Sequence, residues 1–156
     1  MEIKRLIESS ITMEFMSMIV YQDLANKVYD EKSLEVLRYL ARGEESHIAT
    51  LVEIFTRYGR EAMESPWEVD IIKAHRKEAL AKLEKALEKW GISSDSSAES
   101  ILDFAQDAER YAHNYYLDLA RKSSDEKLAG IFKTIAKEEK DHEVNIIRLK
   151  EMIKAG

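Results

Sequence analysis

The sequence repeats itself at a spacing of 95 residues, and the two copies align without a gap. The run Asp23-Leu24-Ala25 recurs as Asp118-Leu119-Ala120, and Asp30-Glu31-Lys32 recurs as Asp125-Glu126-Lys127. Such a repeat is the signature of a duplicated supersecondary unit, whose copies bury their apolar faces against each other. The two halves are therefore expected to fold alike and to pack together.

Each half carries the pattern of two long helices. Apolar residues recur at helical steps over about 3–28 and 31–58 in the first half. They do so again over about 98–122 and 125–155 in the second half. The composition agrees, because Pro occurs once and Gly five times while Ala, Leu, Glu and Lys are abundant. Strand-like alternation is absent from the sequence.

Capping residues predict where these helices begin and end. Ser96 and Ser123 each open a Ser-x-x-Glu pattern, the capping box that precedes a helix. Asp30 is placed to cap the second helix of the first half, and Gly59 is placed to end it.

The segment between the halves predicts a fifth helix over about 66–90. Its start is the run Ser65-Pro66-Trp67-Glu68, with a Ser cap and Pro in the first turn. A helix of this length spans about 37 Å, enough to carry the chain back along a bundle. We expect this return to bring the third bundle helix parallel to the first.

The fold class expected from these features is all-α. One domain over 1–156 would hold a four-helix bundle made of two helical hairpins, about 3–59 and about 98–155. The long helical crossover of about 66–90 would connect them.

Each half also carries a Glu-x-x-His motif, with another glutamate 30 residues upstream. Residues three apart share one face of a helix. Because the upstream glutamate and the motif are equally far from the hairpin joint, all these side chains are expected at one level, about 21 Å from the joint. The six residues are Glu14, Glu44, His47, Glu109, Glu139 and His142.

The neighbours of these residues indicate that they face the core. Ile11, Leu40 and Ile135 lie one turn away, and no Lys or Arg shares the faces at this level. Four buried carboxylates without partners would cost several kcal/mol each. Two divalent cations would balance their charge, with the imidazoles as neutral ligands. A single Glu-x-x-His is more often a solvated helix face, but its duplication favours a dinuclear carboxylate site.

Tyr21 and Tyr116 follow Glu14 and Glu109 by seven residues and stay on the same helix faces. They either hydrogen-bond to the ligand carboxylates and orient them, or pack as ordinary buried tyrosines with their hydroxyls satisfied elsewhere. The sequence leaves both interpretations open.

Other polar residues are predicted to lie outside the metal site. His113 is assigned a packing role, and His75 is placed on the surface of the connecting helix. Glu45 and Glu138 flank the two motifs and are expected to face solvent.

At the duplicated glutamates and histidines the chain resembles the ferritin-like superfamily, and most closely the rubrerythrin-type diiron-carboxylate domain. The likeness covers both hairpins and leaves out the connecting helix. The resemblance implies that two iron ions are bound, with manganese as the alternative. It assigns Glu14 and His47 to one iron, Glu109 and His142 to the other, and a bridging role to Glu44 and Glu139.

The resemblance implies an oxidoreductase of oxidative defence or iron metabolism, either rubrerythrin-like or a ferroxidase, which reduces peroxide or dioxygen. A non-catalytic iron-binding or metal-buffering protein and a dimanganese catalase-like enzyme are the alternatives. Many rubrerythrins carry an extra glutamate one turn from the ligand of the third helix, where this chain has Gln106 and Ala112.

The remaining expectations concern partners and location. Rubrerythrins often append a Cys-rich electron-transfer domain, and this chain has no Cys, so a separate electron-donor protein is expected. The formal charge of −6 argues against a nucleic-acid partner. No apolar run is long enough to span a membrane and no signal peptide is present, which favours a soluble cytoplasmic protein. A homodimer is expected if the apolar stripe of the connecting helix is left uncovered.

Overall fold

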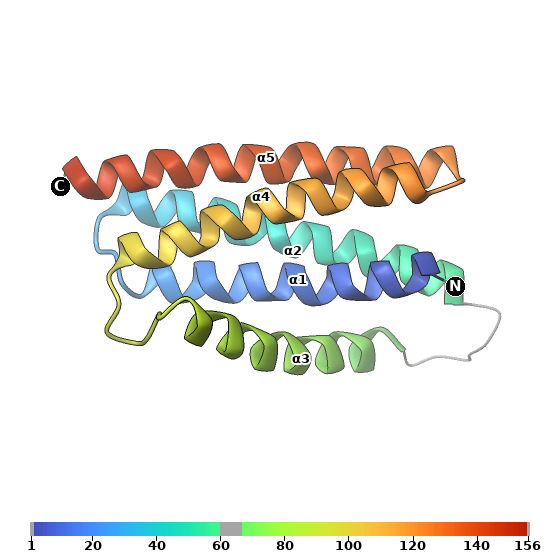
Figure 1. The fold of residues 1–156 in the computed structure, drawn as a ribbon, viewed down its shortest axis with the longest axis horizontal. Coiled ribbons are helices and arrows are strands. Elements are labelled where there is room, and N and C mark those ends of the chain that lie inside the picture. The colour runs from blue at the N-terminus through green and yellow to red at the C-terminus, as the bar shows by residue number, and fades with distance from the viewer. Residues whose placement is uncertain (1, 60–66, 156) are drawn as a thin grey trace.

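A computed structural model of the chain describes residues 2–59 and 67–155, and nearly all of this is helix. Helices α1 (Glu2–Ala25) and α2 (Glu31–Gly59) form one hairpin, and α4 (Ala98–Lys122) and α5 (Glu126–Ala155) form the other (Figure 1). Helix α3 (Trp67–Lys89), which connects the hairpins in the sequence, packs on the outside of the bundle along α1. The expected all-α bundle of two hairpins with a helical crossover is confirmed.

The direction of α4 differs from the expectation. It runs antiparallel to α1 (Figure 1), so that Tyr115, late in α4, donates a hydrogen bond of 3.0 Å to the carbonyl of Leu6, early in α1. The reason is that α3 returns the chain to the end where α1 finishes, and α4 must start there and run back. The predicted parallel arrangement was therefore wrong, and the two hairpin joints lie at opposite ends of the bundle.

The helix caps lie within two residues of their predicted positions. Asp30 accepts a hydrogen bond of 2.9 Å from the backbone N–H of Ser33, as expected at the start of α2. Ser97 caps α4 in place of Ser96. Asp125 caps α5 in place of Ser123, accepting hydrogen bonds from the two backbone N–H groups of Lys127 and Leu128. Adjacent Ser and Asp residues compete for this role, and the sequence alone does not rank them.

The crossover helix α3 is only partly covered. Ala79 and Leu83 are buried, whereas Leu80 and Trp90 are exposed. Of the predicted helix start, Ser65 and Pro66 lie outside the described residues. Because part of the apolar stripe faces solvent, the homodimer stays a prediction. None of the described helices is long and apolar enough to cross a membrane.

The core consists of two apolar clusters, one toward each end of the bundle. One cluster contains Ile7, Ile11, Leu51 and Phe132 among its members. The other contains Leu24, Leu37, Leu102 and Ile146 among its members. Each cluster takes residues from both hairpins, since the hairpins meet along their whole length. The middle of the bundle, between the clusters, is left for polar side chains.

Candidate metal centre

Six polar side chains from four helices are buried together in the middle of the bundle. Helix α1 contributes one glutamate, α4 another, and α2 and α5 each contribute a Glu-x-x-His motif. Each of the six residues is at most 3% exposed. They are the six that the sequence singled out: Glu14, Glu44, His47, Glu109, Glu139 and His142.

These six residues form two overlapping groups whose carboxylate oxygens and imidazole nitrogens lie within 4.8 Å of one another. Glu44 and Glu139 belong to both groups, the position that the resemblance assigns to bridging ligands. The assignment of individual ligands stays a prediction. One group is Glu14, Glu44, His47 and Glu139, and the other is Glu44, Glu109, Glu139 and His142.

Both imidazole rings turn their Nδ1 atoms toward the carboxylates. His142 Nδ1 lies 2.6 Å from Glu44 Oε1, and His47 Nδ1 lies 3.4 Å from Glu14 Oε2. The two rings stack with their centroids 5.7 Å apart. Equivalent nitrogens of the two repeats therefore point into one shared space.

Several carboxylate oxygens in this space lack hydrogen-bond partners, which tests whether a metal ion fits. Glu109 Oε2 and both side-chain oxygens of Glu139 accept no hydrogen bond from the described residues. His47 Nδ1 lies 2.7 Å from Glu139 Oε1, but the groups are not aligned as a hydrogen bond. Buried carboxylates without partners are strongly disfavoured, and oxygen and imidazole donors suit hard divalent cations. The cluster is compatible with metal binding.

The acids of the cluster do not share one protonation state. Burial, followed by the charges of the neighbouring carboxylates, raises the pKa of Glu44 and Glu139 well above its usual range. Burial would also raise the pKa of Glu14, but hydrogen bonds with Glu44 and His47 outweigh it and hold that pKa at about 2. Without metal, like charges this close are tolerated only when some of them hold protons.

The histidines are held protonated by the same carboxylates. Burial would lower the pKa of His47, but its contacts with Glu139 and Glu14 raise it to about 11. The pKa of His142 rises to about 10 through Glu109 and Glu139, again against the effect of burial. Since both values exceed the ordinary 6.5, the protonated rings stabilise the metal-free fold below pH 6.5. That stabilisation is lost as the pH rises through 10 to 11.

Metal binding is expected to release protons at pH 7. Each histidine must become neutral to bind a metal, and any proton held by Glu44 or Glu139 must leave as well, so at least two protons should be released. The apparent affinity should therefore rise with pH from 7 toward 10. Calorimetric titration with Mn²⁺ in two buffers of different ionisation enthalpy measures the number of protons. An affinity independent of pH would contradict the prediction.

The two buried tyrosines bind carboxylates of the opposite hairpin. Tyr21 of α1 donates a hydrogen bond to Glu109 of α4, and Tyr116 of α4 donates one of 2.5 Å to Glu14 of α1. Burial and the nearby carboxylates raise the pKa of both phenols well above 10, so they remain donors. Of the two interpretations left open by the sequence, the hydrogen bond to a candidate ligand describes the contact.

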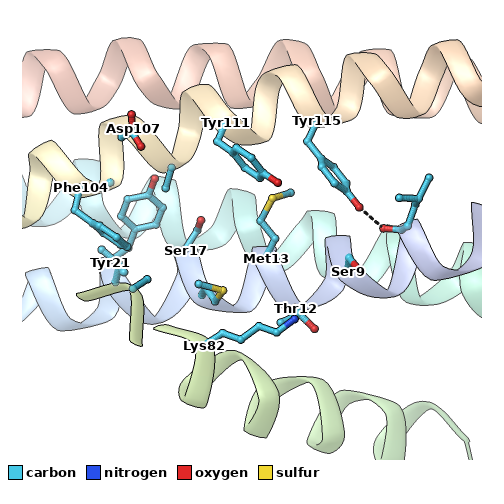
Figure 2. A pocket seen from close by; sticks show the side chains of 16 residues that line it. Ser9, Thr12, Met13, Ser17, Tyr21, Lys82, Phe104, Asp107, Tyr111 and Tyr115 are labelled. Carbon is cyan, nitrogen blue, oxygen red and sulfur yellow. Dashed lines mark hydrogen bonds between the residues drawn. The ribbon is translucent and has the colours of Figure 1, made fainter. Parts of the chain in front are cut away.

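A cavity of about 590 Å³ lies between α1, α3 and α4 and reaches Tyr21 (Figure 2). Its wall mixes apolar side chains such as Met13 and Phe104 with the hydroxyl groups of Ser17 and Tyr111. Tyr21 lines the cavity and also hydrogen-bonds to Glu109. Only the side chain of Tyr21 would therefore separate a small molecule in the cavity from this candidate metal ligand.

Three polar residues near the site test the remaining predictions. Glu138 was expected to face solvent; its side chain is 52% exposed, yet Oε2 lies 2.5 Å from His47 Nε2. His75, expected on the surface, is only 8% exposed and hydrogen-bonds to Thr12 at 3.0 Å. The exposure of Glu138 agrees with the prediction. The prediction for His75 was wrong because its partner, Thr12, comes from another helix. His113 donates a hydrogen bond to the carbonyl of Ala136, as a packing residue would.

Gly43 is a site residue that the sequence analysis missed. A Cβ atom at this position would lie 2.5 Å from His142 Nε2 and 2.7 Å from Cε1, closer than atoms pack. The available signal was a glycine in the middle of a helix, which costs stability and often marks a close approach. The ring of His142 thus packs directly against the backbone of α2.

Gly43→Ala is expected to displace His142 and to weaken metal binding. At an exposed position inside a helix, replacing Gly by Ala raises the free energy of unfolding by about 1 kcal/mol. The Gly43→Ala protein should lack this gain. Gly130→Ala is the matched control, because Gly130 lies on α5 with open space around its Cα and should show the gain. Urea unfolding of both variants in chelator compares them. Equal stabilisation of the two would contradict the prediction.

Comparison with known proteins gave a match to a protein-family model. Residues 100–155 match the family model Rubrerythrin, over most of α4 and all of α5. Neither the curated proteins nor the solved structures gave a significant match. The matched segment contains Glu109, Glu139 and His142. The resemblance to a rubrerythrin-type, ferritin-like domain is thus confirmed by the family model over the second hairpin, and the helical architecture of the described chain agrees with it.

Proposed function

We propose that this chain is a diiron oxidoreductase that reduces peroxide or dioxygen, in oxidative defence or iron metabolism. The observation that carries the proposal is the pair Glu44 and Glu139, which belongs to both four-residue groups of candidate ligands. Two groups that share two carboxylates are the arrangement that a bridged pair of metal ions requires. The family match over the second hairpin supports the same conclusion.

Six side chains would hold the metal ions. In the proposed arrangement Glu14 and His47 bind one ion, Glu109 and His142 bind the other, and the two shared glutamates bridge. Four carboxylate charges balance two divalent ions, and these donors favour iron or manganese over copper or calcium. When bound, two iron(II) ions supply one electron each, which together with two protons convert hydrogen peroxide to two waters.

The residues around the ligands would keep the centre ordered and dry. Tyr21 fixes one oxygen of Glu109, and Tyr116 fixes one oxygen of Glu14. The other oxygen of Glu109 has no hydrogen bond, and that of Glu14 faces His47. The two apolar clusters exclude water from both ends of the centre. Such a site strengthens the electrostatic interactions within it and limits side reactions.

Electrons for repeated turnover would come from a donor outside these 156 residues, which contain no Cys to bind an electron-transfer metal centre of the rubredoxin kind. A cytoplasmic location and a homodimer belong to the same proposal. The exposed apolar side chains of α3, such as Leu80, support the homodimer.

A metal-buffering protein without turnover is the second candidate. It is favoured by one observation, the lack of an extra acid beside Glu109. Ala112 is buried at one of the two flanking positions, and Gln106 at the other accepts a hydrogen bond from Lys150. The candidate predicts reversible binding of two metal ions and no turnover with reductant.

Stopped-flow mixing of the iron(II)-loaded chain with peroxide tests the proposal. Oxidation, followed by near-ultraviolet absorbance, should be much faster than that of free iron(II) in the same buffer. Two bound ions oxidised no faster than free iron would favour metal buffering. Oxygen evolution from peroxide without reductant, by protein that metal analysis shows to contain manganese, would favour a dimanganese catalase-like enzyme.

A further inference from the structure

The repeat is broken at one position beside the candidate metal centre. At the spacing of 95 residues, Gly43 of α2 corresponds to Glu138 of α5. Each of the two lies against the histidine of the opposite hairpin: Glu138 against His47, and Gly43 against His142. The two histidines therefore have different surroundings although they occupy equivalent places in the repeat.

Glu138 contacts the ring nitrogen of His47 that faces away from the carboxylate cluster. Its Oε2 lies 2.5 Å from Nε2, while Nδ1 of the same ring faces the carboxylates of Glu14 and Glu139. A carboxylate on one ring nitrogen makes that nitrogen the N–H donor and leaves the other as the ligand. Glu138 belongs to neither group of candidate ligands, so it acts on a metal ion only through His47.

His142 has no such support. Its Nε2 faces the backbone at Gly43, and among the described residues no hydrogen bond to this nitrogen is found. Tyr39 packs edge-on against the ring with centroids 6.1 Å apart, but its hydroxyl donates to Asp141. Apart from the contact of Nδ1 with Glu44, only packing holds the ring of His142 in place.

The phenol contacts of the two upstream glutamates are equivalent in the two halves. Tyr21 binds Glu109 and Tyr116 binds Glu14, so each upstream glutamate has one phenol from the opposite hairpin. Both bridging candidates belong to both groups. The difference between Glu138 and Gly43 is thus a feature that distinguishes the surroundings of one histidine from those of the other.

We infer that Glu138 makes the centre unequal, so that the half containing Glu14 and His47 takes the first metal ion and binds it more tightly. The inference rests on the proposed metal site. A carboxylate behind a ligand histidine makes the ring more basic and orients it in advance, and loss of such a partner lowers metal affinity by about 10- to 100-fold. The half containing Glu109 and His142 fills second, and Glu138 is a positioning residue.

Titration of the full metal-free chain with Co²⁺ at pH 7 tests the inference through visible absorbance. The wild-type chain should bind two ions in two steps, with affinities separated by about 10- to 100-fold. Glu138→Ala should lower the affinity of the first step by that factor and leave the second unchanged, so that the steps merge. Glu138→Gln retains an oxygen acceptor and should restore part of the difference.

A spectroscopic measurement identifies which half binds first. With one equivalent of Co²⁺, proton NMR in water should show a single shifted imidazole N–H signal that exchanges slowly, because Glu138 protects the Nε2 proton of His47. In Glu138→Ala this signal should exchange faster. Glu45→Ala is the matched control, since it removes an exposed carboxylate next to the first motif and should change neither measurement.

The inference would be overturned by equal affinities in the wild-type chain, by an equal loss at both steps in Glu138→Ala, or by the same loss in Glu45→Ala. A chain that binds no Co²⁺ would remove the proposed function as well. Two-ion binding that Glu138→Ala leaves unchanged would remove this inference alone. Circular dichroism establishes that each variant is folded.

Discussion

Glu44→Ala is expected to abolish the rapid, peroxide-driven oxidation of bound iron. Glu44 belongs to both groups of candidate ligands, so its loss damages both metal sites at once. Loss of a residue that hydrogen-bonds to a metal ligand lowers metal affinity or activity by about 10- to 100-fold. Loss of a ligand shared by both sites should therefore lower the oxidation rate by more than about 100-fold. Stopped-flow mixing of iron(II)-loaded protein with peroxide gives the rate.

The neighbouring residue supplies the control for this variant. Glu45 follows Glu44 in α2 but is exposed, so Glu45→Ala removes the same charge without touching the centre. Glu44→Gln keeps the shape of the side chain and separates loss of charge from loss of volume. Helix content by circular dichroism establishes that the variants are folded. A Glu44→Ala protein that oxidises iron at the wild-type rate would refute the proposed centre.

Removal of metal is expected to lower the melting temperature by on the order of 15 to 30 °C. An ion present at a thousand times its dissociation constant stabilises the fold by about 4 kcal/mol, and two sites contribute about twice that. For a chain of this size each kcal/mol corresponds to roughly 2 to 4 °C. The physical origin is the set of buried carboxylates, which lose their counter-charge when the ions leave.

Differential scanning calorimetry with and without EDTA measures this effect. The Glu44→Ala protein is the internal comparison, because a chain that has lost its sites should melt at the same temperature in both conditions. A wild-type chain whose melting temperature does not respond to chelator would indicate a purely structural helical bundle.

Much of the fold was predictable because helical periodicity and duplication are local properties of the sequence. The bounds of α4 match the prediction at both ends, and those of α2 and α5 lie within one residue. The convergence of the six polar residues followed from the equal spacing of 30 residues in the two hairpins. Equal distance from the joints places them near the middle of the bundle even though the joints lie at opposite ends.

The failures concern contacts between elements. The direction of α4 depends on the end of the bundle at which α3 finishes. The apolar periodicity of a helix does not reveal this. His75 was placed by the face of its own helix, whereas its partner, Thr12, comes from another helix. Glu138 is exposed as predicted, but its contact with His47 of another helix was not foreseen. Gly43 was overlooked because its role is to leave room for His142, a side chain almost one hundred positions away.

The antiparallel arrangement of α1 and α4 relates the two hairpins by an approximate half-turn about an axis across the bundle. Two separate, identical hairpins could associate in the same way, but strict symmetry would then force the same residue on both sides of the axis. Fusion of the copies into one chain removes that constraint. The two sides of the axis can then carry different residues at equivalent positions, as Gly43 and Glu138 do.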